Sequence, residues 1–247
     1  MIEIKSRTHA LRLFAQSVRF GDLFKAVLYT GYRGDKDKIP FYYSKYTGHS
    51  SYIDLTEPMD TIFASMKSNT RNEIRRAERE GITAQEGNSM ERFIEFYNDF
   101  CKSKGLNDLT SQSRMSKYPN VMLTEAVQGG NILAMHANVL DEGSRIAFLL
   151  YSCSPRFESG IDKKLIGWGN RYLHYKDLEW LKEKGYKIYD WSGVCTDPDN
   201  PRYSIGQFKL SFGGKLVESI VLKSPLFFMA EWLRSVVRKV RESLRSV

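Results

Sequence analysis

Residues 121–153 read VMLTEAVQGGNILAMHANVLDEGSRIAFLLYSC. Three runs rich in aliphatic and aromatic residues occupy this stretch, at Val121–Val127, Asn131–Leu140 and Arg145–Cys153. A Gly-Gly pair separates the first two runs and Asp-Glu-Gly-Ser separates the last two, and such short segments are typical of turns between paired strands. The stretch therefore predicts an antiparallel meander of three strands.

Helical periodicity flanks the meander on both sides. Met90–Lys104 places four aromatic residues on one helical face, and Lys163–Lys184 has helical spacing that ends at Gly185. Three further elements are expected after this second helix: a strand at Tyr186–Trp191, a short helix at Ile205–Ser211 and a strand at Lys215–Leu222.

The part of the chain before the meander is less regular. Apolar residues recur every three or four positions over Met59–Ala77 and stop at Gly81, which predicts one helix of about six turns. Earlier we expect an amphipathic stretch at Ala10–Phe20, and strands at Phe24–Tyr32, Ser51–Leu55 and Ile82–Gln85. These patterns suggest a partial N-terminal subdomain over 1–85, a main α/β domain over 86–223 and a C-terminal helix over 224–247.

The composition narrows the class of protein. The chain has 247 residues, 42% of them hydrophobic, which excludes general disorder. Its formal net charge of +8 favours anionic partners such as nucleic acid, a phosphorylated ligand or a membrane surface. Three cysteines without close spacing indicate neither a zinc knuckle nor a disulfide framework. With no secretory leader and no apolar run of spanning length, we expect a cytoplasmic protein.

Three segments, together with the order of elements, carry a family resemblance: KSNTRNEIRRAEREGI (67–82), NRYLH (170–174) with KGYKIYDWSG (184–193), and IGQFKLSFGG (205–214). They resemble the Fem-like, or FemABX-type, aminoacyltransferase branch of the GNAT acyltransferase superfamily, in a single-domain variant. The resemblance implies a mixed, mostly antiparallel sheet flanked by helices and splayed between its fourth and fifth strands. It also implies a partial N-terminal GNAT-like half and a catalytic domain over 86–223.

The same resemblance implies a reaction. An aminoacyl group would move from aminoacyl-tRNA to an amine on a phosphate-bearing cell-envelope precursor or related metabolite, forming an amide bond. An alternative is an acyl-CoA-dependent N-acyltransferase acting on a nucleotide- or lipid-linked amino sugar. In place of the pyrophosphate-binding loop of the coenzyme A enzymes, this chain has RFESGID (156–162). No tightly bound cofactor is implied.

Basic residues form a stripe along the predicted helix before Gly81. Lys67, Arg71 and Arg75 lie at intervals of four and so share one helical face, where they can approach a chain of phosphates. A solvated face neutralised by neighbouring glutamates is the alternative interpretation.

The third motif contains the pair Phe208-Lys209 on a short helix before a Gly-Gly turn. The motif implies that Lys209 points into the splay of the sheet, with Phe208 beside it at the substrate. An ammonium group there can bind a phosphate or stabilise the oxyanion that forms during attack on a carbonyl. An ordinary solvated lysine is the alternative.

The second motif supplies candidates for proton transfer. His174 lies on the long helix with Asn170 one turn earlier, and Asp190 lies near the end of the fifth strand. An imidazole or a carboxylate can take the proton that an attacking amine must lose. A structural role is the alternative for each, and the spacing of the histidines indicates no metal site. Cys195 has no base placed near it by sequence, so we expect no cysteine nucleophile.

The tail from Ser224 combines an apolar stripe with basic residues that lie largely off that stripe. Such a helix fits an anionic membrane surface, which would place the protein at the inner face of the cell membrane through residues 226–247. Docking on protein is the alternative for the tail. A non-catalytic module that binds RNA or a membrane surface is the rival function for the whole chain.

Overall fold

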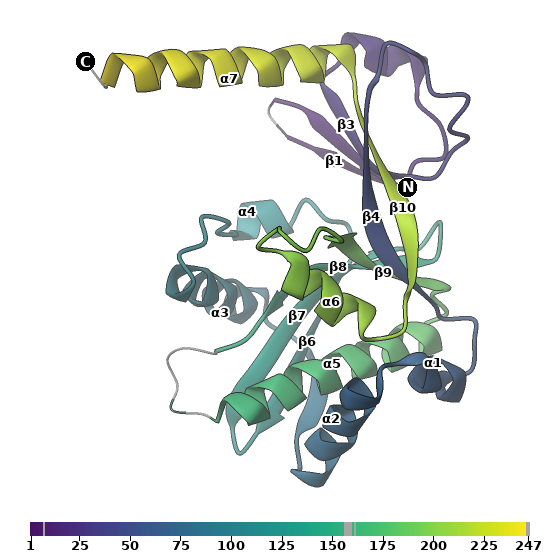
Figure 1. Cartoon of the computed structure of the whole chain (residues 1–247), viewed down its shortest axis with the longest axis vertical. Helices are drawn as coiled ribbons and strands as arrows, with labels where there is room; N and C mark the ends of the chain where they lie inside the picture. The colour runs from purple at the N-terminus through teal and green to yellow at the C-terminus, as the bar shows by residue number, and fades with distance from the viewer. Residues whose placement is uncertain (7, 156–159, 161, 246–247) are drawn as a thin grey trace. The chain divides into compact units, whose positions relative to one another are not determined.

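A computed structural model describes residues 1–6, 8–155, 160 and 162–245, and from residue 238 onward it describes only the backbone (Figure 1). The chain forms two compact units: residues 1–48 with 218–247, and residues 49–217. These boundaries differ from the domain limits expected at 85 and 223. The basic helix expected in the N-terminal part belongs to the second unit, where it packs against the long helix.

The second unit is built on a mixed sheet. Its strands lie in the order β4 (Ser44–Asp54), β9 (Ile188–Val194), β8 (Ile146–Cys153), β7 (Asn131–Asp141), β6 (Val121–Gln128) and β5 (Thr83–Gly87). The pairs from β5 to β8 are antiparallel, which confirms the predicted meander, and β4 is antiparallel to β9. β8 and β9 pair in parallel. The predicted α/β fold with a mostly antiparallel mixed sheet is therefore confirmed.

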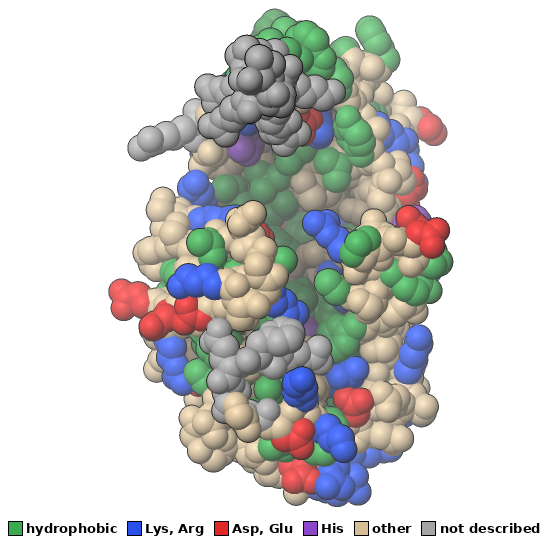
Figure 2. All heavy atoms as spheres, turned by 60° about the vertical axis from the view of Figure 1, so that its left-hand side comes forward, with side chains coloured by type: hydrophobic (Ala, Val, Ile, Leu, Met, Phe, Trp, Pro, Cys, Tyr) green, Lys and Arg blue, Asp and Glu red, His purple; other side chains and the backbone are tan. Residues whose placement is uncertain are grey.

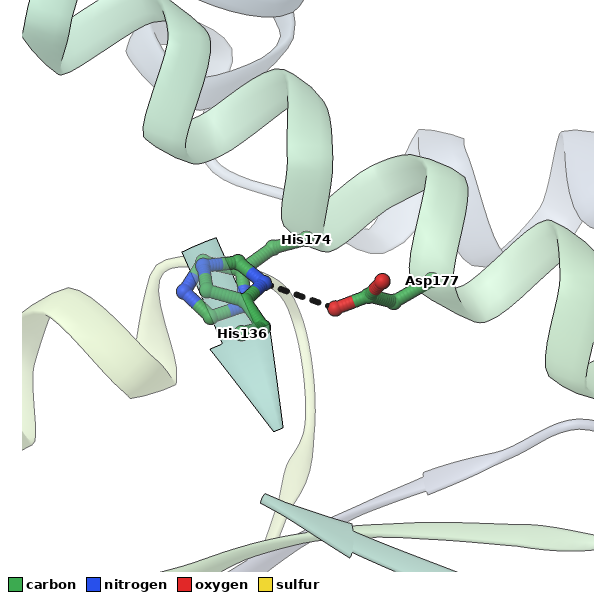
Figure 3. A group of neighbouring side chains, drawn as sticks. All are labelled: His136, His174 and Asp177. Carbon is green, nitrogen blue, oxygen red and sulfur yellow. Dashed lines mark hydrogen bonds and ion pairs between the residues drawn. The ribbon is translucent and has the colours of Figure 1, made fainter. Parts of the chain in front are cut away.

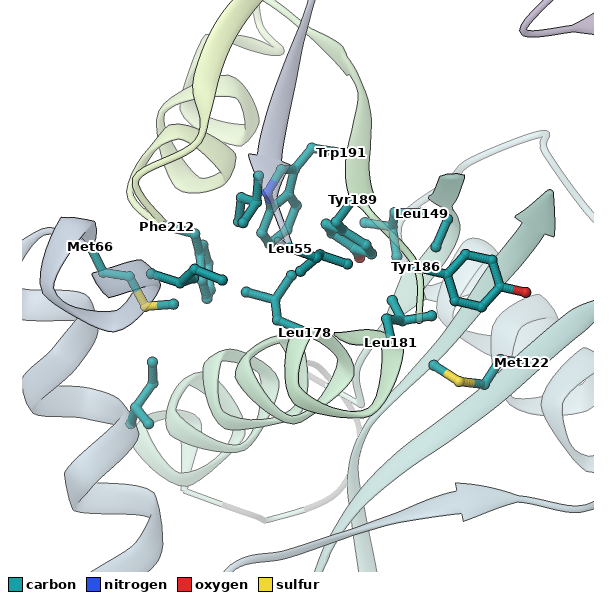
Figure 4. Packing of buried hydrophobic residues seen from close by; sticks show 14 residues of the cluster. Leu55, Met66, Met122, Leu149, Leu178, Leu181, Tyr186, Tyr189, Trp191 and Phe212 are labelled. Carbon is teal, nitrogen blue, oxygen red and sulfur yellow. The ribbon is translucent and has the colours of Figure 1, made fainter. Parts of the chain in front are cut away.

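Helices cover both faces of this sheet. The long helix α5 (Lys163–Glu183) lies against β6 and β7 and also packs against α2 (Ser68–Arg79), whereas α3 (Met90–Ser103) packs on the other face with the short α4 (Gln112–Met115). Successive side chains of β7 point to opposite faces of the sheet, and those of Met135 and Ala137 point to the face that α3 covers. A second core forms between α5, α1 (Met59–Ser65) and β9, with Tyr189, Trp191 and Phe212 fully buried in it (Figure 4).

The single helix predicted over Met59–Ala77 is wrong, because the chain breaks at Met66 and Lys67. Both residues have extended backbone conformations, with ψ of 150° and 145°. The amide of Lys67 donates to the carbonyl of Ser211 at 2.9 Å, and the guanidinium of Arg71 donates to the carbonyls of Ala64 and Met66 at the end of α1. The apolar periodicity continued through the break because Met66 is itself buried in the core.

The strands of the first unit lie in the order β1 (Ile2–Lys5), β2 (Ala10–Leu13), β3 (Val27–Tyr32) and β10 (Lys215–Lys223), of which β10 begins in the second unit. β2 runs parallel to β3, and β1 and β10 pair antiparallel with their neighbours. The amphipathic stretch expected over Ala10–Phe20 begins with the four-residue strand β2 and ends at the first residue of the 3-10 helix η1 (Phe20–Phe24). The helix α7 (Pro225–Arg245) completes this unit.

Candidate active site

The sheet of the second unit opens between β8 and β9. The two strands pair from Ile146 with Ile188 to Phe148 with Asp190, although both continue for several residues beyond. A register shift between β7 and β8 lies beside this point. Ser192 has a positive φ of 59°, and its hydroxyl donates to the carbonyl of Leu149 at 2.7 Å, one residue beyond the last residue of β8 that pairs with β9.

A pocket of about 410 Å³ lies at this opening. It is lined by residues from α3, β8, α5, β9 and the short helix α6 (Tyr203–Leu210). Four residues predicted to act at one site line it together: Asn170, His174, Phe208 and Lys209. Trp191 and Ser152 are among the additional lining residues.

Lys209 reaches the pocket because α6 lies unusually close to the end of β9. A Cβ atom on Gly206 would come within 2.2 Å of the carbonyl oxygen of Cys195, so only glycine permits this contact. The ammonium of Lys209 donates to the carbonyl of Gly193 at 2.8 Å. Burial lowers the pKa of Lys209 to about 8, and the negative charge of Asp190 partly offsets this effect. Lys209 is thus a cation at neutral pH that loses its proton more readily than an ordinary lysine.

Asp190 occupies β9 beside the pocket and is not one of the residues that line it. Its carboxylate accepts from the amide of Ser192 at 2.8 Å and from the hydroxyl of Ser50. These bonds hold the carboxylate in place. The structure therefore places Asp190 as a fixed counter-charge for Lys209.

His174 is buried in a stack of rings. Its ring centroid lies 3.9 Å from that of His136 and 4.7 Å from that of Trp191, with Phe208 and Phe212 nearby. Neither ring nitrogen of His174 has a hydrogen-bond partner within the described part of the chain. Burial, followed by the charge of His136, lowers the pKa of His174 well below its ordinary value. An imidazole of such low basicity takes up a proton poorly, which argues against the expected role as general base.

A polar network that the sequence did not reveal lies behind the pocket (Figure 3). Asp177 Oδ2 lies 2.7 Å from His136 Nδ1 and accepts from the side-chain Nδ2 of Asn138 at 3.1 Å. His136 Nε2 lies 3.0 Å from Asn170 Oδ1, which also accepts from the hydroxyl of Ser152 at 3.4 Å. His136 thus bridges Asp177 on α5 and Asn170 earlier on the same helix, with one ring nitrogen engaged by each. The network engages the oxygen of Asn170 and leaves its NH2 group to serve the pocket.

His136, His174 and Asp177 have the chemistry of metal ligands, and their ligand atoms lie within 4.8 Å of one another. A metal ion binds a histidine in the plane of the ring. The two imidazoles are stacked at an interplanar angle of 24°, so their lone pairs do not converge on one point (Figure 3). Both nitrogens of His136 are also engaged. This group is arranged for stacking and hydrogen bonding rather than for coordination.

The basic stripe does not join the pocket. Lys67 is exposed at the start of α2, Arg71 caps α1, and the guanidinium of Arg75 lies 5.1 Å from the ring centroid of Phe63. None of these three is among the described residues that line the pocket. Arg171, for which the sequence predicted no role, does line it; its guanidinium lies 5.0 Å from the ring centroid of Phe208 and pairs with Glu73 at 2.9 Å.

Two further expectations concern residues near the site. Cys195 is half-buried and does not line the pocket. The loop over 156–162 has five residues, 156–159 and 161, that lie outside the described part of the chain.

The sequence held one signal for the missed network. His136 and Asn138 are polar residues two positions apart in an otherwise apolar strand, so they share one face of the sheet. Asp177 follows His174 by three residues on the predicted long helix, so the two lie on the same helical face. Buried polar groups on facing elements must satisfy one another, so the pattern was a pointer to a shared network.

Solved structures resemble this fold across most of the chain. FemX matches with a TM-score of 0.63 at 13% identity, covering 88% of this chain and 82% of that one. The C-terminal domain of a protein described as a lysylphosphatidylglycerol synthetase from Agrobacterium fabrum matches with 0.60 at 12% identity, covering 95% and 83%. L-PGS from Bacillus licheniformis matches with 0.57 at 12% identity, covering 90% and 80%.

Neither the known family models nor the curated proteins match this sequence. At such low identity the structural likeness establishes the fold. The chain has the Fem-like, GNAT-type fold that its three motifs predict.

Proposed function

We propose that this protein is an acyl- or aminoacyltransferase whose reaction takes place in the pocket between β8 and β9. The observation that carries the proposal is Lys209, a partly desolvated cation held at the opening of a splayed sheet. The folds of FemX and of the two lysylphosphatidylglycerol synthetase structures support the class of reaction. Fold alone would not suffice, because one fold serves many functions.

The proposed step is direct attack in a ternary complex. The acceptor nitrogen forms a bond to the donor carbonyl carbon, and the bond from that carbon to the leaving oxygen or sulfur breaks. The proton lost by the amine passes to the leaving group, and Asp190 acts indirectly, as the counter-charge of Lys209. Lys209 stabilises the oxyanion and the NH2 group of Asn170 orients the acyl group, because both are fixed donors at the pocket.

The preferred donor is aminoacyl-tRNA, and the preferred acceptor is an amine on a phosphate-bearing envelope precursor. The net charge of +8 suits two anionic substrates. The name lysylphosphatidylglycerol synthetase also denotes an aminoacyl group joined to a phosphate-bearing molecule. The pocket volume of about 410 Å³ suits the reacting end of a donor, whose remainder would lie outside. Acyl-CoA with a nucleotide- or lipid-linked amino sugar is the alternative, and both pairings fit a cytoplasmic enzyme.

The test offers radiolabelled aminoacyl-tRNAs and acyl-CoAs side by side to the full chain, with amino-sugar nucleotides and lipid-linked precursors as acceptors. Lys209→Met should lower kcat at least about a hundredfold, as loss of one oxyanion donor does. Lys163→Met, at an exposed position of α5, is the matched control and should leave kcat unchanged. Resistance of the product to mild alkali distinguishes an amide from an ester.

Two outcomes would contradict the proposal. One is a covalent acyl-enzyme on Cys195 with parallel initial-rate plots, since direct attack requires intersecting plots and an active Cys195→Ala variant. The other is that folded wild-type protein transfers no group from any of the donors, which would favour a non-catalytic binding module.

A further inference from the structure

We propose that the first unit binds the surface of an anionic lipid bilayer through a single apolar face that α7 and η1 share. The face consists of Phe20, Phe24, Met229, Trp232, Leu233 and Val237. This proposal does not depend on the transferase activity. It extends the expectation for the tail by adding a second insertion element.

Large apolar side chains of this unit are exposed to an unusual degree. Phe20 is 76% exposed and Phe24 is 69% exposed, and on α7 the exposed fractions are 58% for Trp232 and 53% for Leu233. Hydrophobic side chains gather on the surface of this unit at the top of Figure 2. Exposed apolar residues grouped on neighbouring elements mark an interaction surface, whereas scattered ones do not.

The two aromatic residues of η1 are presented by a rigid turn. Asp22, between them, is buried and accepts from the guanidinium of Arg12 at 2.8 Å and from the hydroxyl of Tyr29. Because the carboxylate is held inside, Phe20 and Phe24 on either side of it remain at the surface. Their exposure is therefore a property of the fold and not of a loose loop.

The start of α7 is fixed in the same unit. The buried hydroxyl of Ser224 accepts from the amide of Val27 at 2.9 Å, donates to the carbonyl of Lys25 at 2.6 Å and caps the first turn through the amide of Phe227. The ring of Phe227 packs edge-on against His9 at 5.3 Å. α7 also contacts η1. Because η1 and α7 contact each other, we infer that their exposed apolar residues meet one partner together.

Charge decides which partner this surface fits. The sequence of α7 contains five basic residues and two acidic ones, a net charge of 5 − 2 = +3, and the acidic Glu231 is already paired with Lys223. Arg19 and Lys25 flank η1. A second copy of the chain would bring these positive charges together, whereas an anionic bilayer neutralises them and accepts the apolar side chains.

The geometry also suits binding in the plane of the membrane. No helix in the described residues is long and apolar enough to cross a bilayer. A helix with an apolar stripe and a basic remainder lies in the interface, with its apolar side between the headgroups.

The test measures sedimentation of the full chain with vesicles of phosphatidylcholine alone or with phosphatidylglycerol added. Wild type should pellet with the anionic vesicles, and added salt should release it. Leu233→Asp should weaken the apparent affinity about tenfold or more, because one apolar insertion is lost. Phe20→Ser with Phe24→Ser should weaken it comparably. Leu109→Asp, at an equally exposed apolar position of the second unit, should bind as wild type.

Circular dichroism and light scattering accompany each variant, so that folding and oligomeric state are known. The proposal is overturned if the wild type does not bind the vesicles, or if all variants bind them as the wild type does. So would a wild-type dimer that Leu233→Asp converts to monomer without any vesicle binding overturn it, since the occupant would then be a second copy.

Discussion

The two units differ in the feature that sets each apart: a buried polar network in the second and a group of exposed aromatic and aliphatic side chains in the first. The second unit buries polar groups: His136, Asp177 and Asn138 lie inside a closed network behind a pocket. The first unit exposes apolar groups: Phe20 and Trp232 stand at its surface although its core is well filled. The comparison suggests that the second unit is adapted for chemistry and the first for attachment.

The largest expected effect on stability comes from breaking the buried network. Asp177→Ala leaves His136 charged or unpaired inside the protein and should lower the free energy of unfolding by about 3–5 kcal/mol. Urea denaturation measures the change. Asp177→Asn, which retains an oxygen acceptor, should recover part of it, and Asp199→Ala at an exposed site should have no effect. If Asp177→Ala leaves the free energy of unfolding as unchanged as Asp199→Ala does, the hydrogen bonds of Asp177 do not stabilise the fold.

The next effect concerns the approach of α6 to β9. Gly206→Ala places a Cβ atom against the carbonyl of Cys195 and should destabilise the second unit by about 1–3 kcal/mol. Gly193→Ala is the control, because a Cβ there meets nothing within 4 Å. A thermal melt of both variants checks the contrast. If the two melt alike, the close contact does not determine the position of Lys209.

A smaller effect is expected at the anchor of α7 in the first unit. Ser224→Ala removes a helix cap and leaves the amide of Val27 without its acceptor, which should cost about 1–2 kcal/mol. Ser235→Ala, whose hydroxyl bonds only within α7, should cost less. Hydrogen exchange at Val27 and along the first turn of α7 would locate the effect, and exchange unchanged there would contradict it.

Lys209 predicts a pH-dependent contribution of the second unit. Folding lowers its pKa from 10.5 to about 8, so between these values the unfolded chain binds a proton that the folded chain does not. The contribution of Lys209 to the free energy of unfolding therefore rises as the pH rises from 8 to 10.5. Urea titrations should show that any gain in the free energy of unfolding of Lys209→Met over wild type below pH 8 becomes smaller between pH 8 and pH 10.5. If the difference in free energy of unfolding between wild type and Lys209→Met does not change with pH, the lysine is solvated in the folded protein.

The smallest effect on stability belongs to the exposed aromatics. Phe20→Ser should change the free energy of unfolding by no more than about 0.5 kcal/mol, because the side chain is already in water. The same change should weaken vesicle binding. A marked loss of stability would show that Phe20 packs on protein and would remove the contrast between the units.

Local patterns predicted most elements because each buries one face with a regular period. The meander and the helices α3 and α5 follow directly from alternating or helical spacing. The break at Met66 was hidden because its side chain is buried on the same side as those of the helices around it. The division into units depends on which strands pair far along the chain, and such pairing leaves no local trace.

Only those residues of the candidate site that belong to the Fem-like motifs were predicted from the sequence. Lys209, Asn170, His174 and Phe208 converge as the Fem-like motifs imply. The environment of His174 was not readable, because burial and the neighbouring His136 come from β7 and the sheet rather than from the motif. The same holds for Arg71, whose guanidinium is engaged by a helix end that the sequence did not place there.

The discontinuity of the first unit also has a consequence for synthesis. Residues 49–217 are contiguous and can pack as soon as they leave the ribosome, whereas residues 1–48 must wait for residues 218 onward. Until then β3 lacks its partner β10, and Val27 lacks the hydroxyl of Ser224. The nascent chain therefore carries an open strand edge through most of its translation. The exposed apolar residues of α7 are synthesised last, after the residues of the pocket.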